Sequence, residues 1–256
     1  MIILKKSPAF TETALGDKIY RHELKFETDY DKARRIKAQF ALALTPDPNG
    51  GADGSYIVKS LYFETPYSDD YTDKELGVQF RQKMRLRTYA GSDVYKLEIK
   101  SKNGDVATKY SVSLTQAGAQ QVAAGDYGFL ADKASAEALF IYHQLVTRVY
   151  RPLMVVAYRR YAYLQPAGNF RLTFDEDLRW SADPAGLFTP DHLSGVVTDK
   201  TVIEVKYDDF VPNWLTDRLH RTGMNAGESS KYAAAFRSIF DLYKNKKAKL
   251  LTYFII

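Results

Sequence analysis

The sequence predicts a mainly antiparallel β protein with flanking helices, in which eight strands form a closed tunnel with a charged lumen. Three observations lead to this fold class. Apolar and ionic residues alternate with period 2 in eight segments, the segments lie in adjacent pairs, and several intervening segments have one apolar helical face. Aromatic residues make up 14% of the chain, including 19 Tyr and 14 Phe, which favours strands.

The expected strands and helices follow one another without an internal repeat. We expect strands near residues 18–27, 56–64, 80–90, 94–102, 107–114, 151–163, 169–176 and 200–207. We expect long helices at 29–43, 133–147 and 229–244, and short helices at 67–76, 115–123 and 213–222. Turn-forming residues predict loops at 45–55 and at roughly 181–199. Because similar strands lie on both sides of these loops, we expect a single domain over residues 1–256, with its core at about 18–245.

Length, charge and composition limit the function. The chain has 256 residues, of which 45% are hydrophobic, enough for a large core. A formal net charge of +5 indicates an anionic partner without identifying it. Cysteine is absent, which excludes disulfides, thiolate metal sites and cysteine nucleophiles. No apolar run approaches the ~20 residues that span a bilayer, so we expect a cytoplasmic protein without a membrane segment.

The expected strands carry ionic side chains on one face and apolar side chains on the other. Lys83, Arg85 and Arg87, for example, alternate with Met84 and Leu86. Other ionic positions that follow this alternation are Arg21, Glu23, Lys25, Lys96, Glu98, Lys100, Lys109, Arg160, Arg171, Glu204 and Lys206. One interpretation is a sandwich whose ionic faces contact solvent.

We favour the opposite interpretation, because amphipathic helices need an apolar surface to pack against. If the helices cover the apolar strand faces, the ionic faces point inward. An eight-stranded barrel has room inside only for side chains or one small ligand. Two like charges 4 Å apart repel by about 4 kcal/mol at an effective dielectric constant of 20, so a cationic lumen requires an anionic ligand. Polyphosphate fits best, because Arg binds phosphate through two hydrogen bonds and Lys binds it as a point charge.

Eight short motifs occur in an order that is known from one family. They are Arg21-x-Glu23-x-Lys25-Phe26, Leu61-Tyr62-Phe63-Glu64-Thr65, Arg85-Leu86-Arg87-x-Tyr89, Lys96-x-Glu98-x-Lys100, Tyr158-Arg159-Arg160-x-Ala162-Tyr163, Arg171-Leu172-Thr173-Phe174-Asp175, Val202-Ile203-Glu204-Val205-Lys206-Tyr207 and Ser230-Lys231-Tyr232. With these motifs the chain resembles the VTC-type polyphosphate polymerase domain, a branch of the triphosphate tunnel metalloenzyme (CYTH-like) superfamily. The resemblance implies a closed antiparallel tunnel flanked by helices.

The resemblance also implies roles for individual residues. The candidate catalytic residues are Arg85, Arg87, Arg160, Arg171 and Lys231, and the candidate phosphate-binding residues are Arg21, Lys25, Lys100, Lys109 and Lys206. Glu204 matches the carboxylate that holds Mn²⁺ or Mg²⁺, and Glu23 is a candidate second ligand. Arg21 stands where the wider superfamily has a metal-binding Glu, which favours the polymerase branch. We expect Glu98 and Asp175 to form ion pairs rather than bind metal.

Three functions are compatible with these residues. The first is a metal-dependent polyphosphate polymerase, which transfers the terminal phosphoryl group of a nucleoside triphosphate, ATP by family precedent, to growing polyphosphate. The second is a triphosphatase that uses water as the acceptor, and the third is a polyphosphate-binding module without turnover. We expect no nucleic-acid partner, because the aromatic residues alternate onto faces that helices cover. The residues leave the oligomeric state open.

Overall fold

The computed structural model describes residues 17–19, 22–104, 106–189, 195–208, 211–223, 227 and 229–241. Within these residues the strands form one 11-stranded sheet in the order β1-β7-β6-β5-β4-β8-β9-β11-β2, with β10 paired to β9 and β3 paired to β8. Every pairing is antiparallel. The predicted class, antiparallel β with flanking helices, is confirmed.

Eight long strands carry the sheet, and each corresponds to a predicted strand. They are β2 (His22–Thr28), β4 (Ser55–Glu64), β5 (Phe80–Tyr89), β6 (Tyr95–Asn103), β7 (Val106–Leu114), β8 (Arg151–Gln165), β9 (Phe170–Ser181) and β11 (Thr201–Tyr207). The short strands are β1 (Asp17–Ile19), β3 (Thr45–Pro46) and β10 (Gly195–Thr198). The sequence did not predict β3 and β10, which lie within the expected loops, because so few residues show no periodic pattern. It predicted β1 only as the start of a single strand at 18–27, whereas β1 pairs with β7 and β2 pairs with β11.

The helices lie where the sequence predicts them. They are α1 (Tyr30–Ala41), α2 (Asp69–Glu75), α3 (Gln116–Ala123), α4 (Ala136–Thr147) and α5 (Asn213–Arg221), and residues 231–241 are also helical. Asp29, Thr115 and Ser135 start α1, α3 and α4, because each side chain accepts a hydrogen bond from a backbone N–H of the first turn. Among the described helices, none combines the length and the apolar character that crossing a membrane requires.

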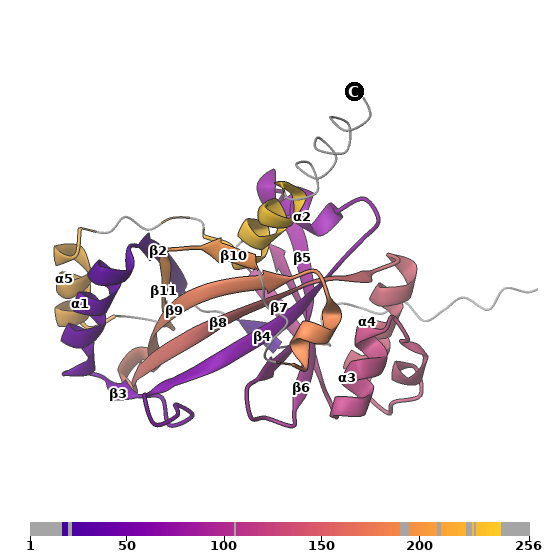
Figure 1. The fold of residues 1–256 in the computed structure, drawn as a ribbon, viewed down its shortest axis with the longest axis horizontal. Coiled ribbons are helices and arrows are strands. Elements are labelled where there is room, and N and C mark those ends of the chain that lie inside the picture. Colours follow the sequence, from indigo (N-terminus) through magenta and orange to yellow (C-terminus); the bar gives the residue numbers. More distant parts are fainter. Residues whose placement is uncertain are drawn as a thin grey trace, which may run out of the picture.

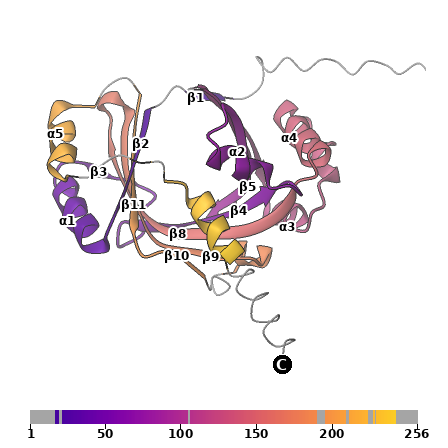
Figure 2. The same cartoon turned by 90° about the horizontal axis from the view of Figure 1, so that it is seen from above.

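The sheet curls strongly around a central space (Figure 1, Figure 2). Figure 2 shows β2 and β11 on one side of this space, β4 and β5 on the other, and β8 and β9 connecting the two sides. The edge strands β1 and β2 follow each other in the chain, but no pairing joins them among the described residues. The sheet is therefore a curled half-barrel, and the predicted closed tunnel overstated the closure.

Two groups of helices cover the outer face of the sheet. Phe40 of α1 and Leu215 of α5 pack in one apolar cluster with Phe174 of β9. Ile141 of α4 packs in a second cluster with Leu97 of β6. The apolar strand faces are therefore covered by helices, as the amphipathic patterns predict, and the ionic faces turn toward the central space.

The inner face is not ionic throughout. The helical segment 231–241 packs against it through Tyr232 and Ile239, in a third cluster that contains Val58, Met154 and Trp180. Part of the inner face is therefore apolar and filled by protein, which leaves only the remaining part to charged side chains. The alternation pattern could not predict this division, because the division depends on where helical segment 231–241 packs.

Candidate active site

A cavity of about 200 Å³ lies on the inner side of the curled sheet. All of the long strands except β9 contribute side chains to its wall, together with residues 229–232. The basic side chains that line it are Lys25, Lys83, Arg85, Arg87, Lys100, Lys109, Arg160, Lys206 and Lys231, and the acidic ones are Glu23, Glu98 and Glu204. Nine basic and three acidic groups leave a formal excess of six positive charges. Such an excess in a confined space strongly favours an anionic ligand.

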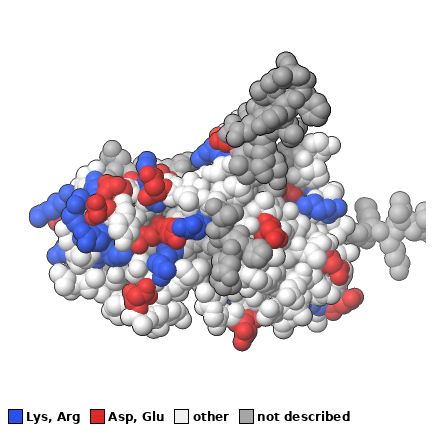
Figure 3. All heavy atoms as spheres, viewed as in Figure 1, with Lys and Arg blue, Asp and Glu red and all other residues white. Residues whose placement is uncertain are grey.

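A second group of basic residues lies on the outer surface. Lys and Arg gather at the end of the molecule formed by α1 and α5 (Figure 3), where Arg34, Arg35, Arg218 and Arg221 are exposed. These side chains contact solvent, so their charges are screened. The cations of the cavity are different residues from different elements, and they face one another across the cavity.

The structure brings together ten of the twelve predicted site residues. Arg171 does not line the cavity. Its Nη2 donates hydrogen bonds to Asp47 Oδ2 at 2.7 Å and to the Tyr56 hydroxyl at 2.8 Å. Asp47 is 124 positions away in the chain, so alternation within β9 could not predict this partner. Arg21 lies outside the described residues.

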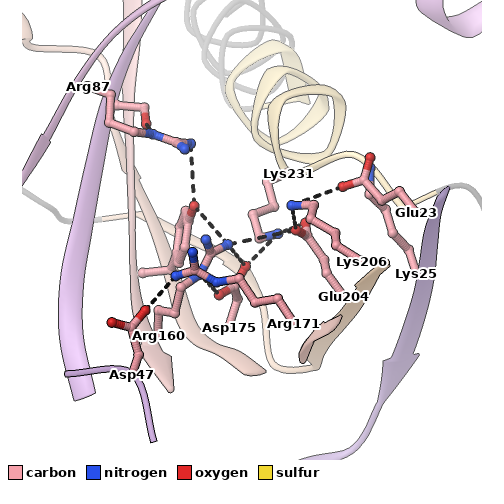
Figure 4. Close-up of polar contacts among 12 residues, drawn as sticks. Glu23, Lys25, Asp47, Arg87, Arg160, Arg171, Asp175, Glu204, Lys206 and Lys231 are labelled. Atoms are coloured by element: carbon pink, nitrogen blue, oxygen red, sulfur yellow. Dashed lines mark hydrogen bonds and ion pairs between the residues drawn. The ribbon is translucent and has the colours of Figure 1, made fainter. Parts of the chain in front are cut away.

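Glu204, on β11, is the centre of an ion-pair network (Figure 4). Its Oε1 lies 2.6 Å from Lys231 Nζ, and its Oε2 lies 2.8 Å from Lys206 Nζ and 3.8 Å from Arg160 Nη2. Burial by itself raises the pKa of Glu204, but Lys231, Lys206 and Arg160 together outweigh burial and hold this pKa well below its usual range. Glu204 is therefore ionised and already neutralised by protein groups.

Asp175, on β9, completes the network from beneath the cavity wall. Arg160 donates to it from Nε at 2.6 Å and from Nη2 at 2.7 Å, and Lys231 Nζ lies 2.7 Å away. The Arg160 contact is bidentate, the strongest geometry for this pair. Asp175 is thus an ion-pair residue, as expected, and Glu98 likewise pairs with Arg85 at 2.8 Å.

Glu23 and Glu204 are the candidate metal ligands. Lys206 Nζ lies between them, 3.2 Å from Glu23 Oε1 and 2.8 Å from Glu204 Oε2. Among the described residues, no group of three or more His, Cys, Asp or Glu could hold a metal ion. Mg²⁺ and Mn²⁺ nevertheless bind with one or two carboxylates plus phosphate oxygens. The two glutamates fit this requirement if Lys206 moves aside.

The side of the cavity that faces away from Glu23 and Glu204 is poor in carboxylates. Lys83, Arg87, Lys100 and Lys109 line it from β5, β6 and β7, and within the described part of the chain none has a carboxylate within 4 Å. Arg87 instead donates to the hydroxyls of Ser60, at 3.0 Å, and of Tyr158, at 3.4 Å. The cavity therefore has a half near β2 and β11 in which the charges are paired. In the half formed by β5, β6 and β7, Arg85 is paired with Glu98 and the other four cations have no carboxylate partner among the described residues.

Residues 20–240 match the VTC domain family. The chain belongs to this family. The match covers most of the chain and confirms the resemblance on which the sequence interpretation rests. No curated protein matches the sequence.

Two solved structures share the fold of this VTC domain protein. One is a putative adenylate cyclase from Bacillus halodurans, with a TM-score of 0.53 and 12% identity over 83% of this chain and 95% of that one. The other is a putative adenylyl cyclase from Hippeastrum that is described as having a dominant triphosphatase activity, with a TM-score of 0.51 and 17% identity over 84% of this chain and 94% of that one. At these identities the similarity shows the fold alone.

Several cavity residues of this VTC domain protein were not among the predicted site residues. Lys83 shares its strand face with Arg85 and Arg87, so alternation alone was a sufficient signal for it. The others are Tyr62, Tyr158, Ser229, Ser230 and Tyr232, and Glu98 appears there as an ion-pair partner. Residues 229–232 carry no strand pattern, and only the packing of segment 231–241 brings them to the cavity.

Proposed function

We propose that this VTC domain protein is a metal-dependent polyphosphate polymerase. It transfers the terminal phosphoryl group of ATP to the end of a polyphosphate chain and releases ADP. The observation that carries the proposal is the formal excess of six positive charges around an inner cavity. Phosphoryl transfer depends mainly on positioning and on neutralising charge at the phosphoryl oxygens, and such a cavity supplies both.

In this proposal the cations act in two groups. Those that neutralise charge at the transferred group are Arg85, Arg87, Arg160 and Lys231, and those that bind the more distant phosphates are Lys25, Lys100, Lys109 and Lys206. Arg171 is bonded to Asp47 and Tyr56, so we propose no direct phosphate contact for it. Glu204 and Glu23 are the proposed ligands of Mn²⁺ or Mg²⁺, which supplies Lewis-acid stabilisation of phosphate oxygens when bound.

The electrostatics of the cavity favour an anionic acceptor over water. None of the described residues that line the cavity is a His, and each of the three lining carboxylates lies within 4 Å of a basic group. The cations keep the pKa of Glu23, Glu98 and Glu204 below the usual range, although burial acts in the other direction. Such carboxylates are weak general bases. A terminal phosphate oxygen is already an anionic nucleophile and needs no base.

A triphosphatase is the second candidate function. The observation that favours it is the shared fold with the Hippeastrum protein, which is described as having a dominant triphosphatase activity. Both reactions use the same cationic cavity and differ only in the acceptor. Incubation of the pure protein with ATP and Mn²⁺, followed by gel electrophoresis with a polyphosphate stain, separates them. We expect a ladder of polymer and ADP, whereas phosphate without polymer supports the triphosphatase.

Glu204→Gln tests the proposed site within the same assay. We expect turnover to fall roughly 100-fold or more, because the metal that would neutralise the developing negative charge loses a proposed ligand, while tripolyphosphate binding persists. Glu176→Gln is the matched control, because Glu176 is equally buried and pairs with Lys37 at 2.8 Å outside the cavity. This control should lose stability but keep its turnover. If both variants keep wild-type turnover, Glu204 is only an ion-pair partner.

A further inference from the structure

Lys83 lines the cavity but has no assigned role in the proposed mechanism. It lies on β5 directly opposite Lys100 on β6, which lies directly opposite Lys109 on β7. All three side chains line the cavity. Opposite side chains on neighbouring strands have Cβ atoms about 5 Å apart, and like charges there destabilise the sheet. The row of three lysines is thus a continuous cationic strip across three strands.

The side chain of Lys83 also contacts the residues at the start of helical segment 231–241, which carries Lys231. Its Nζ donates to Ser230 Oγ at 3.0 Å, and the same oxygen accepts from the backbone N–H of Ala233 at 3.3 Å. The Nζ lies 5.3 Å from the centre of the Tyr232 ring. These contacts hold the ammonium group where β5 meets the first turn of helical segment 231–241. The Ser230 hydroxyl accepts in both hydrogen bonds, so its own proton is available to a ligand.

We propose that Lys83 is a further phosphate-binding residue, which binds one phosphate group of the bound chain together with Lys100 and Ser230. The proposal rests on the proposed function, because it takes the cavity as the binding site of a triphosphate or polyphosphate. Ammonium and hydroxyl groups both donate hydrogen bonds to phosphate oxygens. A phosphate in this position would also offset the repulsion along the lysine row.

The surroundings of Lys83 couple phosphate binding to the protonation of its amine. Burial, reinforced by nearby cations, lowers the pKa of Lys83 to about 7. The charged groups that act on it are Lys25 from β2, Lys74 from α2, and Arg81 and Arg85 from β5. Lys100 faces it from β6, and Ser230 and Tyr232 contact it at the start of helical segment 231–241. A bound phosphate favours the protonated amine. Near neutral pH the ligand should therefore bind together with the uptake of up to one proton.

Calorimetric titration with tripolyphosphate tests the proposal, without relying on turnover. Titrations in two buffers of different ionisation enthalpy give the number of protons taken up per ligand. We compare the wild type with Lys83→Arg, which keeps its charge at every pH used, and Lys83→Met, which has none. Because all proteins bind the same ligand, protonation of tripolyphosphate itself cancels in the differences. Lys96→Met is the control, because Lys96 is exposed on β6 and does not line the cavity.

At about pH 8 we expect the wild type to take up more protons per ligand than Lys83→Arg, by as much as one. At about pH 6.5 we expect Lys83→Met to bind roughly tenfold more weakly than the wild type, as for the loss of one charge-assisted contact. Between these two pH values the affinity of Lys83→Arg should change less than that of the wild type, and Lys96→Met should match the wild type.

The possible failures are distinguishable. If tripolyphosphate binds to the wild type but Lys83→Met binds equally well, this inference is wrong and the proposed function is untouched. Equal proton uptake by the wild type and Lys83→Arg would overturn the linkage to protons. If tripolyphosphate does not bind to the wild type at all, the proposed function is wrong, and the role of Lys83 fails with it.

Discussion

Lys206 and Glu204, two residues apart on β11, form an ion pair of 2.8 Å, and the same ammonium group lies 3.2 Å from Glu23. The side chain of Lys206 therefore lies between the two proposed metal ligands. A divalent cation held by Glu23 and Glu204 would neutralise the same oxygens as the ammonium group, so the two would compete for this position. We infer that Lys206 competes with the metal and turns toward the phosphates when the metal binds.

Replacement of Lys206 by Met should change two affinities in opposite directions. Without the competing ammonium group, Mn²⁺ should bind roughly tenfold more tightly, and without one cation tripolyphosphate should bind more weakly. Titration of Mn²⁺ followed by electron paramagnetic resonance, and calorimetry with tripolyphosphate, measure the two effects. Lys109→Met is the control, because Lys109 lines the cavity away from both glutamates. An equal gain in Mn²⁺ affinity in both variants would show a general charge effect and no competition.

Tripolyphosphate should raise the melting temperature strongly. Ligand at 100 times its dissociation constant adds about 2.7 kcal/mol, which is roughly 5–10 °C for a domain of this size. Arg87→Ala should reduce this shift, because Arg87 lines the cavity. Arg171→Ala should keep the shift but lower the melting temperature of the unliganded protein, because buried Asp47 loses its ion-pair partner. Sulfate at matched ionic strength is the control ligand, and an equal shift with sulfate would contradict a polyphosphate site.

Asp70 should make the stability depend on pH. It is 1% exposed and accepts a hydrogen bond from the Tyr150 hydroxyl, and burial raises its pKa to about 7. Between about pH 4 and 7 the folded state binds more protons than the unfolded state, so stability falls as the pH rises from about 4 to about 7 and levels off above it. The rise of the pKa from 3.8 to about 7 corresponds to a loss of stability on the order of 4 kcal/mol.

Asp70→Asn removes this titration and keeps an acceptor for Tyr150. In urea unfolding, the stability of the variant relative to the wild type should therefore increase between about pH 5 and pH 8. Asp69→Asn is the control, because Asp69 is a neighbouring carboxylate whose side chain is 44% exposed. A difference between variant and wild type that is the same at every pH would show that Asp70 does not titrate in this range.

Much of the fold could be predicted because its pattern is local. Side chains alternate along any extended strand, so Lys83, Arg85 and Arg87 share a face whatever the tertiary structure. The same rule placed Glu204 and Lys206 together on β11. Residues 231–241 show helical periodicity, and their helix was predicted without knowledge of its partner.

Contacts between distant segments could not be predicted in the same way. Arg171 follows the alternation of β9 as well as Arg160 follows that of β8, yet Arg160 lines the cavity and Arg171 binds Asp47. The role of Ser230 depends on the packing of the last helix against the inner face of the sheet. Neither contact produces a periodic pattern in the sequence, because each joins residues more than 100 positions apart.

The sequence by itself determined the antiparallel strands, the face on which each ionic side chain lies, and the family to which the motifs belong. Only the tertiary structure decided which of these side chains meet. The curl of the sheet sets which strands face each other across the cavity, and the last helix occupies the apolar part of the inner face. The tertiary structure also placed Lys206 between two glutamates and left Lys83 without a carboxylate partner among the described residues. The physical reason is that alternation is a property of one strand, whereas ion pairing and burial depend on distances between segments that are remote in the chain.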